Sequence, residues 1–262
     1  MTYTHDYLLR ADECDRNLFA RPASINNLLQ EAAGFHAVLL KVGMDDLKPQ
    51  NLTWMLLRFT LNIARCPRWR DTLRIVTWPS GTRGRLCATR EYAAFILPDE
   101  TAPFLTATSE WGLVDIREQR LVRITDEIRS LRTDDTPPSP PLPRIPEIEK
   151  SFLTPNSSLL TVRTFPVRES QIDFNQHVNN SHYIAWILDT LPANLPPASL
   201  ARLDIAYRLP ANIGDTLRVH TRHLPETNTC LHAILRESDN AQLIHAQTTW
   251  QPMANKAADG AD

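Results

Sequence analysis

The pattern of apolar and polar positions predicts two amphipathic helices, each accompanied by alternating strands. Between Ile25 and Leu40, apolar side chains recur at helical spacing, with Ser24 as the expected N-cap and Gly43 as the expected end. A shorter helical stripe follows Asn180 and ends before Pro192. Later in each half, apolar residues alternate with polar ones, which predicts strands with one buried face.

Short patterns repeat in the same order in the two halves, which indicates a duplicated unit. Residues 71–75 pair with 215–219, 57–61 with 203–207, and 15–17 with 173–175. A proline-rich segment separates the copies, because six of the ten residues from Pro137 to Pro146 are proline. Proline removes amide donors and disfavours both helix and central strand.

The expected organisation is therefore two similar domains joined by an extended linker. The first domain is expected at residues 1–136, the linker at 137–150 and the second domain at 151–253. Residues 254–262 are predicted to form a disordered tail. Each unit is expected to be one helix wrapped by a curved antiparallel sheet of about five strands, which is an α+β fold.

Composition narrows the class of protein. The chain has 262 residues, of which 42% are hydrophobic and 22% charged, as in ordinary globular proteins. A net charge of −2 argues against nonspecific nucleic-acid binding. No apolar run is long enough to span a membrane and no signal-peptide pattern is present, so we expect a cytoplasmic protein. Four widely spaced cysteines predict reduced thiols, with neither disulfides nor a metal site.

The basic residues are mostly arginine, and many lie in one stretch. Only four of the 28 basic residues are lysine. Eight arginines fall between Arg58 and Arg90, where Asp71 is the only acid. One interpretation is a solvated sheet face, and the other is a docking face for an acidic partner or a phosphate.

The segment that begins at Asp173 carries the strongest chemical signal. In extended backbone, Asp173, Asn175 and His177 would project from one side, just before a helix whose N-terminal amides favour negative charge. A carboxylate, an amide and an imidazole so placed can activate water and stabilise an oxyanion. A polar turn that caps the helix explains the same residue types, and the residue types alone leave both interpretations open.

This segment resembles the signature of acyl-acyl carrier protein (acyl-ACP) thioesterases, which release free fatty acids from the carrier. The similar residues are Asp173-x-Asn175-x-His177-Val178-Asn179-Asn180 and then Tyr183-Ile184-x-Trp186-Ile187-Leu188. The resemblance implies a tandem, or double, hotdog fold and hydrolysis of acyl-ACP thioesters in fatty acid biosynthesis, without metal or cofactor. The first half resembles the family more loosely, through its long helix and the strand at Trp54.

The resemblance also implies roles for particular residues. Asp173, Asn175 and His177 take the family's catalytic positions, and Asn179 is expected to contact the substrate. The first unit is expected to hold the acyl chain in an apolar slot near Phe35 and Trp54. Acyl carrier protein is the expected partner, and Arg74, Arg83 and Arg85 are the expected docking residues; a homodimer is left open.

The sequence departs from the family at one point. Relatives carry a Glu, often beside a Cys in plant members, where this chain has Pro210 and Ala211. Two alternatives therefore stay open beside the acyl-ACP thioesterase. One is a coenzyme A thioesterase of the same fold, and the other is a catalytically weakened acyl-binding module.

Overall fold

The computed structural model describes residues 1–132, 140, 142–146, 160–193 and 198–252. The strands of the first half are β1 (Tyr3–Leu8), β2 (Leu52–Ile63), β3 (Thr72–Arg83), β4 (Cys87–Ile96), β5 (Leu105–Asp115) and β6 (Arg120–Val122). Its helices are α1 (Pro22–Leu39), α2 (Met44–Leu47) and α3 (Asp126–Arg129). The second half contributes β7 (Leu160–Pro166), α4 (Asn180–Asp189), β8 (Ala198–Tyr207), β9 (Thr216–Leu224), β10 (Thr229–Arg236) and β11 (Gln242–Pro252).

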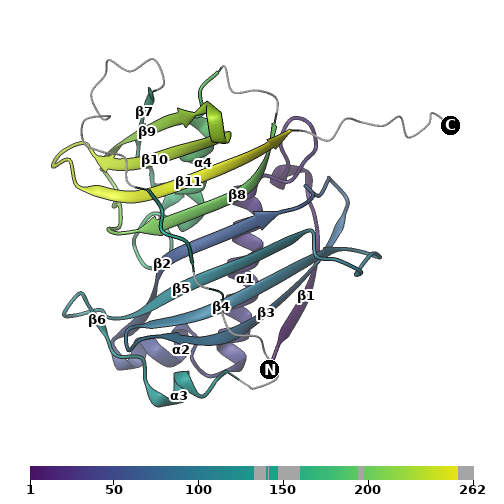
Figure 1. Ribbon diagram of the computed structural model, residues 1–262. Helices are drawn as coiled ribbons and strands as arrows, with labels where there is room; N and C mark the ends of the chain where they lie inside the picture. The colour runs from purple at the N-terminus through teal and green to yellow at the C-terminus, as the bar shows by residue number, and fades with distance from the viewer. Residues whose placement is uncertain (133–139, 141, 147–159, 194–197, 253–262) are drawn as a thin grey trace.

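The described strands form one antiparallel sheet in two matching halves. The strand order is β1-β3-β4-β5-β2-β8-β11-β10-β9-β7, with β6 attached to β5. Counted from either edge to the middle, the order is the same in both halves. The duplicated unit predicted from the sequence repeats is therefore confirmed, and α1 and α4 lie behind the sheet in Figure 1.

The two halves join at β2 and β8. Leu61 lies opposite Leu203 and Phe59 opposite Ile205, so the two segments that match in sequence are partners across the seam. All four side chains are buried in one hydrophobic cluster that also includes residues of α1 and α4. Because each buried Leu, Ile or Phe side chain stabilises the fold by about 1.5–3 kcal/mol, this seam holds the halves as one body.

The boundaries of the first helix differ from the sequence prediction. α1 begins at Pro22, with Arg21 as the N-cap, rather than after Ser24. Proline is favoured at the first helical position because its missing amide hydrogen has no partner there in any case. The second helix begins at Asn180, as the sequence pattern indicated, and ends at Asp189. No described helix is long and apolar enough to cross a membrane.

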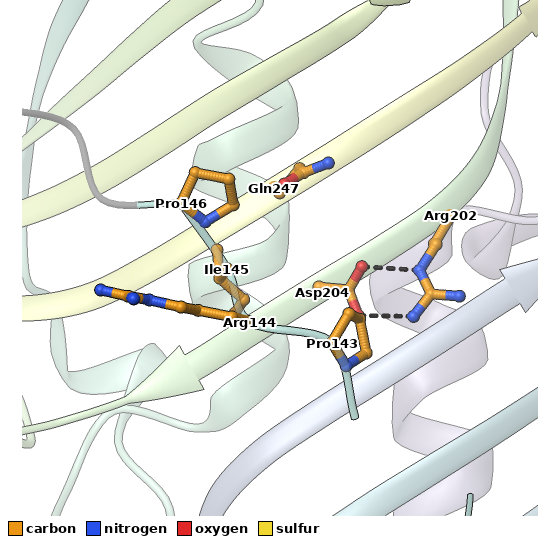
Figure 2. A pocket seen from close by; sticks show the side chains of 7 residues that line it. All are labelled: Pro143, Arg144, Ile145, Pro146, Arg202, Asp204 and Gln247. Carbon is orange, nitrogen blue, oxygen red and sulfur yellow. Dashed lines mark hydrogen bonds and ion pairs between the residues drawn. The ribbon is translucent and has the colours of Figure 1, made fainter. Parts of the chain in front are cut away.

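The described part of the proline-rich segment packs on the sheet. The carbonyl oxygen of Pro143 accepts a hydrogen bond from Arg58 of β2 (2.6 Å), and Ile145 is buried. In Figure 2 this segment lies in front of the strands, across a pocket of about 500 Å³ that includes the Arg202–Asp204 ion pair. The rest of the predicted linker, the predicted tail and the expected domain boundaries near residues 136 and 151 lie outside the described residues.

Candidate active site

The loop before α4 carries the three candidate catalytic residues, and it is a closed turn. Ile172 and Val178 form an isolated antiparallel bridge, and the Asp173 amide donates to the His177 carbonyl (2.8 Å). Gln176 has a positive φ of 65° and closes the turn with a bond to the Asp173 carbonyl (3.0 Å). Of the two backbone conformations left open by the sequence, the structure has the polar turn and not the extended segment, because local hydrogen bonds fold these residues back on themselves.

The Asp173 carboxylate holds the backbone of this loop. Its Oδ1 accepts from the amides of Asn175 (2.8 Å) and His177 (3.4 Å). The first half has the same arrangement, in which Asp15 Oδ1 accepts from the amides of Asn17 (2.8 Å) and Phe19 (2.9 Å). Phe19 occupies the position that corresponds to His177. These hydrogen bonds therefore stabilise the loop whether or not it carries a histidine.

The side chains of Asn175 and His177 face different surroundings. Asn175 is half-buried, and its Oδ1 accepts from the Thr53 hydroxyl of β2 (3.4 Å), which belongs to the first half. His177 is exposed, and no side chain among the described residues hydrogen-bonds its ring. The loop therefore contacts the first half through Asn175, and the His177 imidazole is accessible to a water molecule or a substrate.

The N-terminus of α4 follows directly. The Asn179 side-chain oxygen caps this helix by accepting from the Ser181 amide and the Ser181 hydroxyl (both 2.9 Å). Asn180 donates from Nδ2 to Gln30 Oε1 on α1 (3.1 Å). The predicted substrate residue Asn179 is thus engaged in helix capping through its oxygen, while the first-turn amides favour negative charge beside the loop.

The segment after β8 supports the loop without supplying an acid. Ala211 is fully buried; its amide donates to the Tyr183 hydroxyl (2.8 Å), and its carbonyl accepts from the Val178 amide (3.0 Å). The Pro210 carbonyl accepts from Arg236 (3.0 Å). The family resemblance leads us to expect a carboxylate at Pro210 or Ala211. In this chain, the backbone of the two residues instead connects the end of β8 to α4 and to the loop through hydrogen bonds.

The two aromatic residues expected around the acyl chain lie in different places. Trp54 is half-buried on β2, where its Nε1 donates to the Val42 carbonyl (2.9 Å) and its ring packs against a small cluster with Leu47 and Leu113. Phe35 is 45% exposed and stacks on His5, with 5.9 Å between the ring centroids. The placement of Phe35 between helix and sheet is therefore wrong, because it lies at the edge of the stripe that α1 buries.

The three expected docking arginines do not lie together, and two of them already have acidic partners. Arg74, near the start of β3, pairs with Asp6 and Glu100 (2.7 Å each). Arg83 ends the same strand and pairs with Glu110 (2.6 Å). Nine residues along one strand separate Arg74 and Arg83 by about 30 Å. Arg85 lies in the exposed turn after β3 and not on a strand.

Sequence reasoning missed Thr53, whose bond to Asn175 joins positions 122 residues apart. It also missed a polar contact beneath α1, in which Arg90 meets His36. The residues next to Thr53 and Arg90 in sequence give no indication of these contacts. Among the described residues, no group of three or more His, Cys, Asp or Glu side chains is placed to hold a metal ion.

The family model of the acyl-ACP thioesterase N-terminal domain matches residues 1–131, and the model of the C-terminal domain matches residues 156–252. A chloroplastic palmitoyl-acyl carrier protein thioesterase of Gossypium hirsutum is 27% identical over 285 residues, covering 100% of this chain and 67% of the relative.

Two solved structures share the double hotdog fold. An acyl-ACP thioesterase from Bacteroides thetaiotaomicron VPI-5482 has a TM-score of 0.81 at 23% identity, covering 95% of this chain and 98% of that chain. The 12:0-ACP thioesterase from Umbellularia californica has a TM-score of 0.80 at 21% identity, covering 96% and 97%. With both of its halves matched in sequence and its fold shared, this chain belongs to the acyl-ACP thioesterase family of thioester hydrolases.

Proposed function

We propose that this chain hydrolyses fatty acyl-ACP thioesters to free fatty acid and carrier protein, with His177 as the general base. The observation that carries the proposal is the exposed His177 ring, free of side-chain partners among the described residues, on a loop fixed beside the N-terminus of α4. Family membership supports the substrate, and the loop geometry supports the choice of residues.

In the proposed reaction, His177 takes a proton from a water molecule whose oxygen attacks the thioester carbonyl carbon. The carbon–sulfur bond breaks, and the protonated ring returns the proton to the leaving thiolate. Asn175 accepts from Thr53 through Oδ1, so its Nδ2 hydrogens remain available as donors. Asn175 Nδ2 then donates to the carbonyl oxygen, and the positive end of the α4 helix dipole stabilises the negative charge on it.

A catalytically weakened acyl-binding module remains the second candidate. It is favoured by the lack of a carboxylate at Pro210 and Ala211, where the backbone is used for packing. The third candidate, a coenzyme A thioesterase, shares the fold and the proposed chemistry.

Hydrolysis assays on one acyl group carried by either ACP or coenzyme A separate these functions. We expect kcat/KM to be higher for the ACP thioester. Equal or faster turnover of the coenzyme A thioester would favour a coenzyme A thioesterase. No hydrolysis of either thioester, together with retained acyl binding, would favour the module.

Carrier docking by arginine is proposed for Arg85, because it is exposed and makes no ion pair within the described chain. Arg74 and Arg83 already pair with carboxylates. Arg85→Glu should raise KM for acyl-ACP by ~5-fold at low salt, since a like charge slows encounter with an acidic carrier. The rise should shrink as salt is added, and KM for a small acyl thioester should not change.

The matched control for Arg85 is Arg163→Glu, on the exposed face of β7 at the far edge of the sheet. The control should leave both KM values unchanged. If Arg85→Glu affects both substrates equally, or affects neither, then Arg85 does not dock the carrier.

A further inference from the structure

One amide nitrogen on α1 is buried without an acceptor. Gln30 is half-buried, and its Oε1 accepts from Asn180 Nδ2 of α4 (3.1 Å). Its Nε2 is buried and has no hydrogen-bond partner among the described residues. Asn26, one turn earlier on α1, does not supply the acceptor, since both of its own amide atoms also lack partners there. Buried donors are almost always paired in proteins, so Gln30 Nε2 is available to an acceptor that the described chain does not provide.

The bond to Asn180 places Gln30 beside the catalytic loop. Asn180 is the first residue of α4 and comes three residues after His177. At the other end of the loop, the Thr53 hydroxyl of β2 donates to Asn175 Oδ1 (3.4 Å). The first half therefore contacts this segment at two points, one on α1 and one on β2, and His177 lies between them in the chain.

Gln30 and Asn175 share one arrangement of donor and acceptor. In each carboxamide the oxygen is engaged by a residue of the other half, since Gln30 accepts from Asn180 and Asn175 accepts from Thr53. These bonds orient the planar amide groups and leave the hydrogens of both nitrogens free to donate. Two oriented donors beside a helix N-terminus are the usual composition of an oxyanion hole.

We propose that Gln30 Nε2 donates to the carbonyl oxygen of the thioester, as the second donor beside Asn175 Nδ2. This role rests on the proposed function. Negative charge grows on this oxygen when water attacks, so a fixed donor stabilises the transition state more than the bound substrate. Both halves then supply a donor to the reacting carbonyl, although the first half was expected to hold the acyl chain.

The first test is the turnover of acyl-ACP by Gln30→Met, which keeps an unbranched side chain and removes both hydrogen-bonding groups. The kcat should fall by ~100-fold, the usual effect of losing one oxyanion donor, while KM changes little. Asn180→Ala removes only the bond that orients Gln30, so kcat should fall by less, ~5-fold. The matched control is Asn27→Met, which changes an exposed amide on the same helix and should leave both constants unchanged.

The second test measures the binding of unreactive substrate analogues and identifies the atom that Gln30 contacts. In the ketone analogue a methylene replaces the thioester sulfur and the carbonyl stays, whereas in the thioether analogue a methylene replaces the carbonyl. Both are attached to ACP and carry the same saturated chain. Gln30→Met should weaken binding of the ketone by ~5-fold, the usual contribution of one hydrogen bond, and leave binding of the thioether unchanged.

Wild-type kcat in folded Gln30→Met would overturn the role of Gln30 and leave acyl-ACP hydrolysis intact. Equal weakening of both analogues, or of neither, would also overturn it, because Gln30 would then not contact the carbonyl. If the wild-type chain hydrolyses no acyl-ACP, the proposed function is refuted, and the two analogues still test the contact. If Gln30→Met does not fold, Gln30→Leu replaces it, with the same expected loss of kcat and the same selective effect on the ketone.

Discussion

Replacing His177 with alanine should lower the turnover number on acyl-ACP by ~100-fold or more, which is the usual contribution of a positioned acid–base group. The fold should be unaffected, because the ring is exposed and bonds to no described side chain. The backbone of residue 177 keeps both of its hydrogen bonds within the loop. Its amide still donates to the Asp173 carboxylate, and its carbonyl oxygen still accepts from the Asp173 amide. Steady-state kinetics together with a thermal melt would measure both effects.

The control for His177 is His182, five residues farther on in the first turns of α4. His182 is half-buried, lies beside the tilted ring of Trp186 with 6.2 Å between the ring centroids, and has a pKa lowered by burial. His182→Gln should cost some stability through lost packing and little turnover. Wild-type turnover in folded His177→Ala would show that another group activates the water.

The duplicated unit of helix and antiparallel sheet could be predicted because its pattern occurs twice in the chain, and the family resemblance implied that this unit is a hotdog domain. Residues 71–75 and 215–219 enter equivalent strands, β3 and β9, and the matched segments at 57–61 and 203–207 became the two central strands. A repeated sequence pattern is a good predictor of strand order, because each copy must bury the same face. The family motif in turn located the loop before α4, at the level of residue identity.

The geometry within that loop could not be predicted in the same way. Alternating polar residues are compatible with an extended strand and with a closed turn, and the choice depends on the hydrogen bonds from Asp173. The placement of Phe35 failed for a similar reason. Helical periodicity predicts the buried face of a helix only to within about one residue position. Phe35 lies just outside that face and stacks on His5 of β1.

Contacts between side chains that are far apart in the chain could not be predicted from the sequence. Thr53 hydrogen-bonds Asn175 across 122 positions of sequence, and Arg90 hydrogen-bonds His36 across 54 positions. Charge clustering was also misleading as a guide to docking. Arg74 pairs with Asp6 of β1 and with Glu100 in the loop after β4, and Arg83 pairs with Glu110 of β5. The sequence does not show that these segments are adjacent.

The paired loops offer a test of whether Asp173 acts on the loop or on the substrate. Asp173→Ala should lower turnover by ~10- to 100-fold, because two backbone bonds that place Asn175 and His177 are lost. Asp15→Ala removes the two equivalent bonds from the first half, where no catalytic side chain is carried. Each variant should lose about 1 kcal/mol of unfolding free energy, and only Asp173→Ala should lose activity.

Asp173→Asn distinguishes the two roles further. Its side-chain oxygen can still accept from both amides, so a residue that only positions the loop should recover most of the turnover lost in the alanine variant. A carboxylate that instead contributes its charge to the reaction would not be replaced, and Asp173→Asn would then be as slow as Asp173→Ala. If Asp15→Ala slows turnover as much as Asp173→Ala at matched stability, the effect is global, and the local role assigned to Asp173 is wrong.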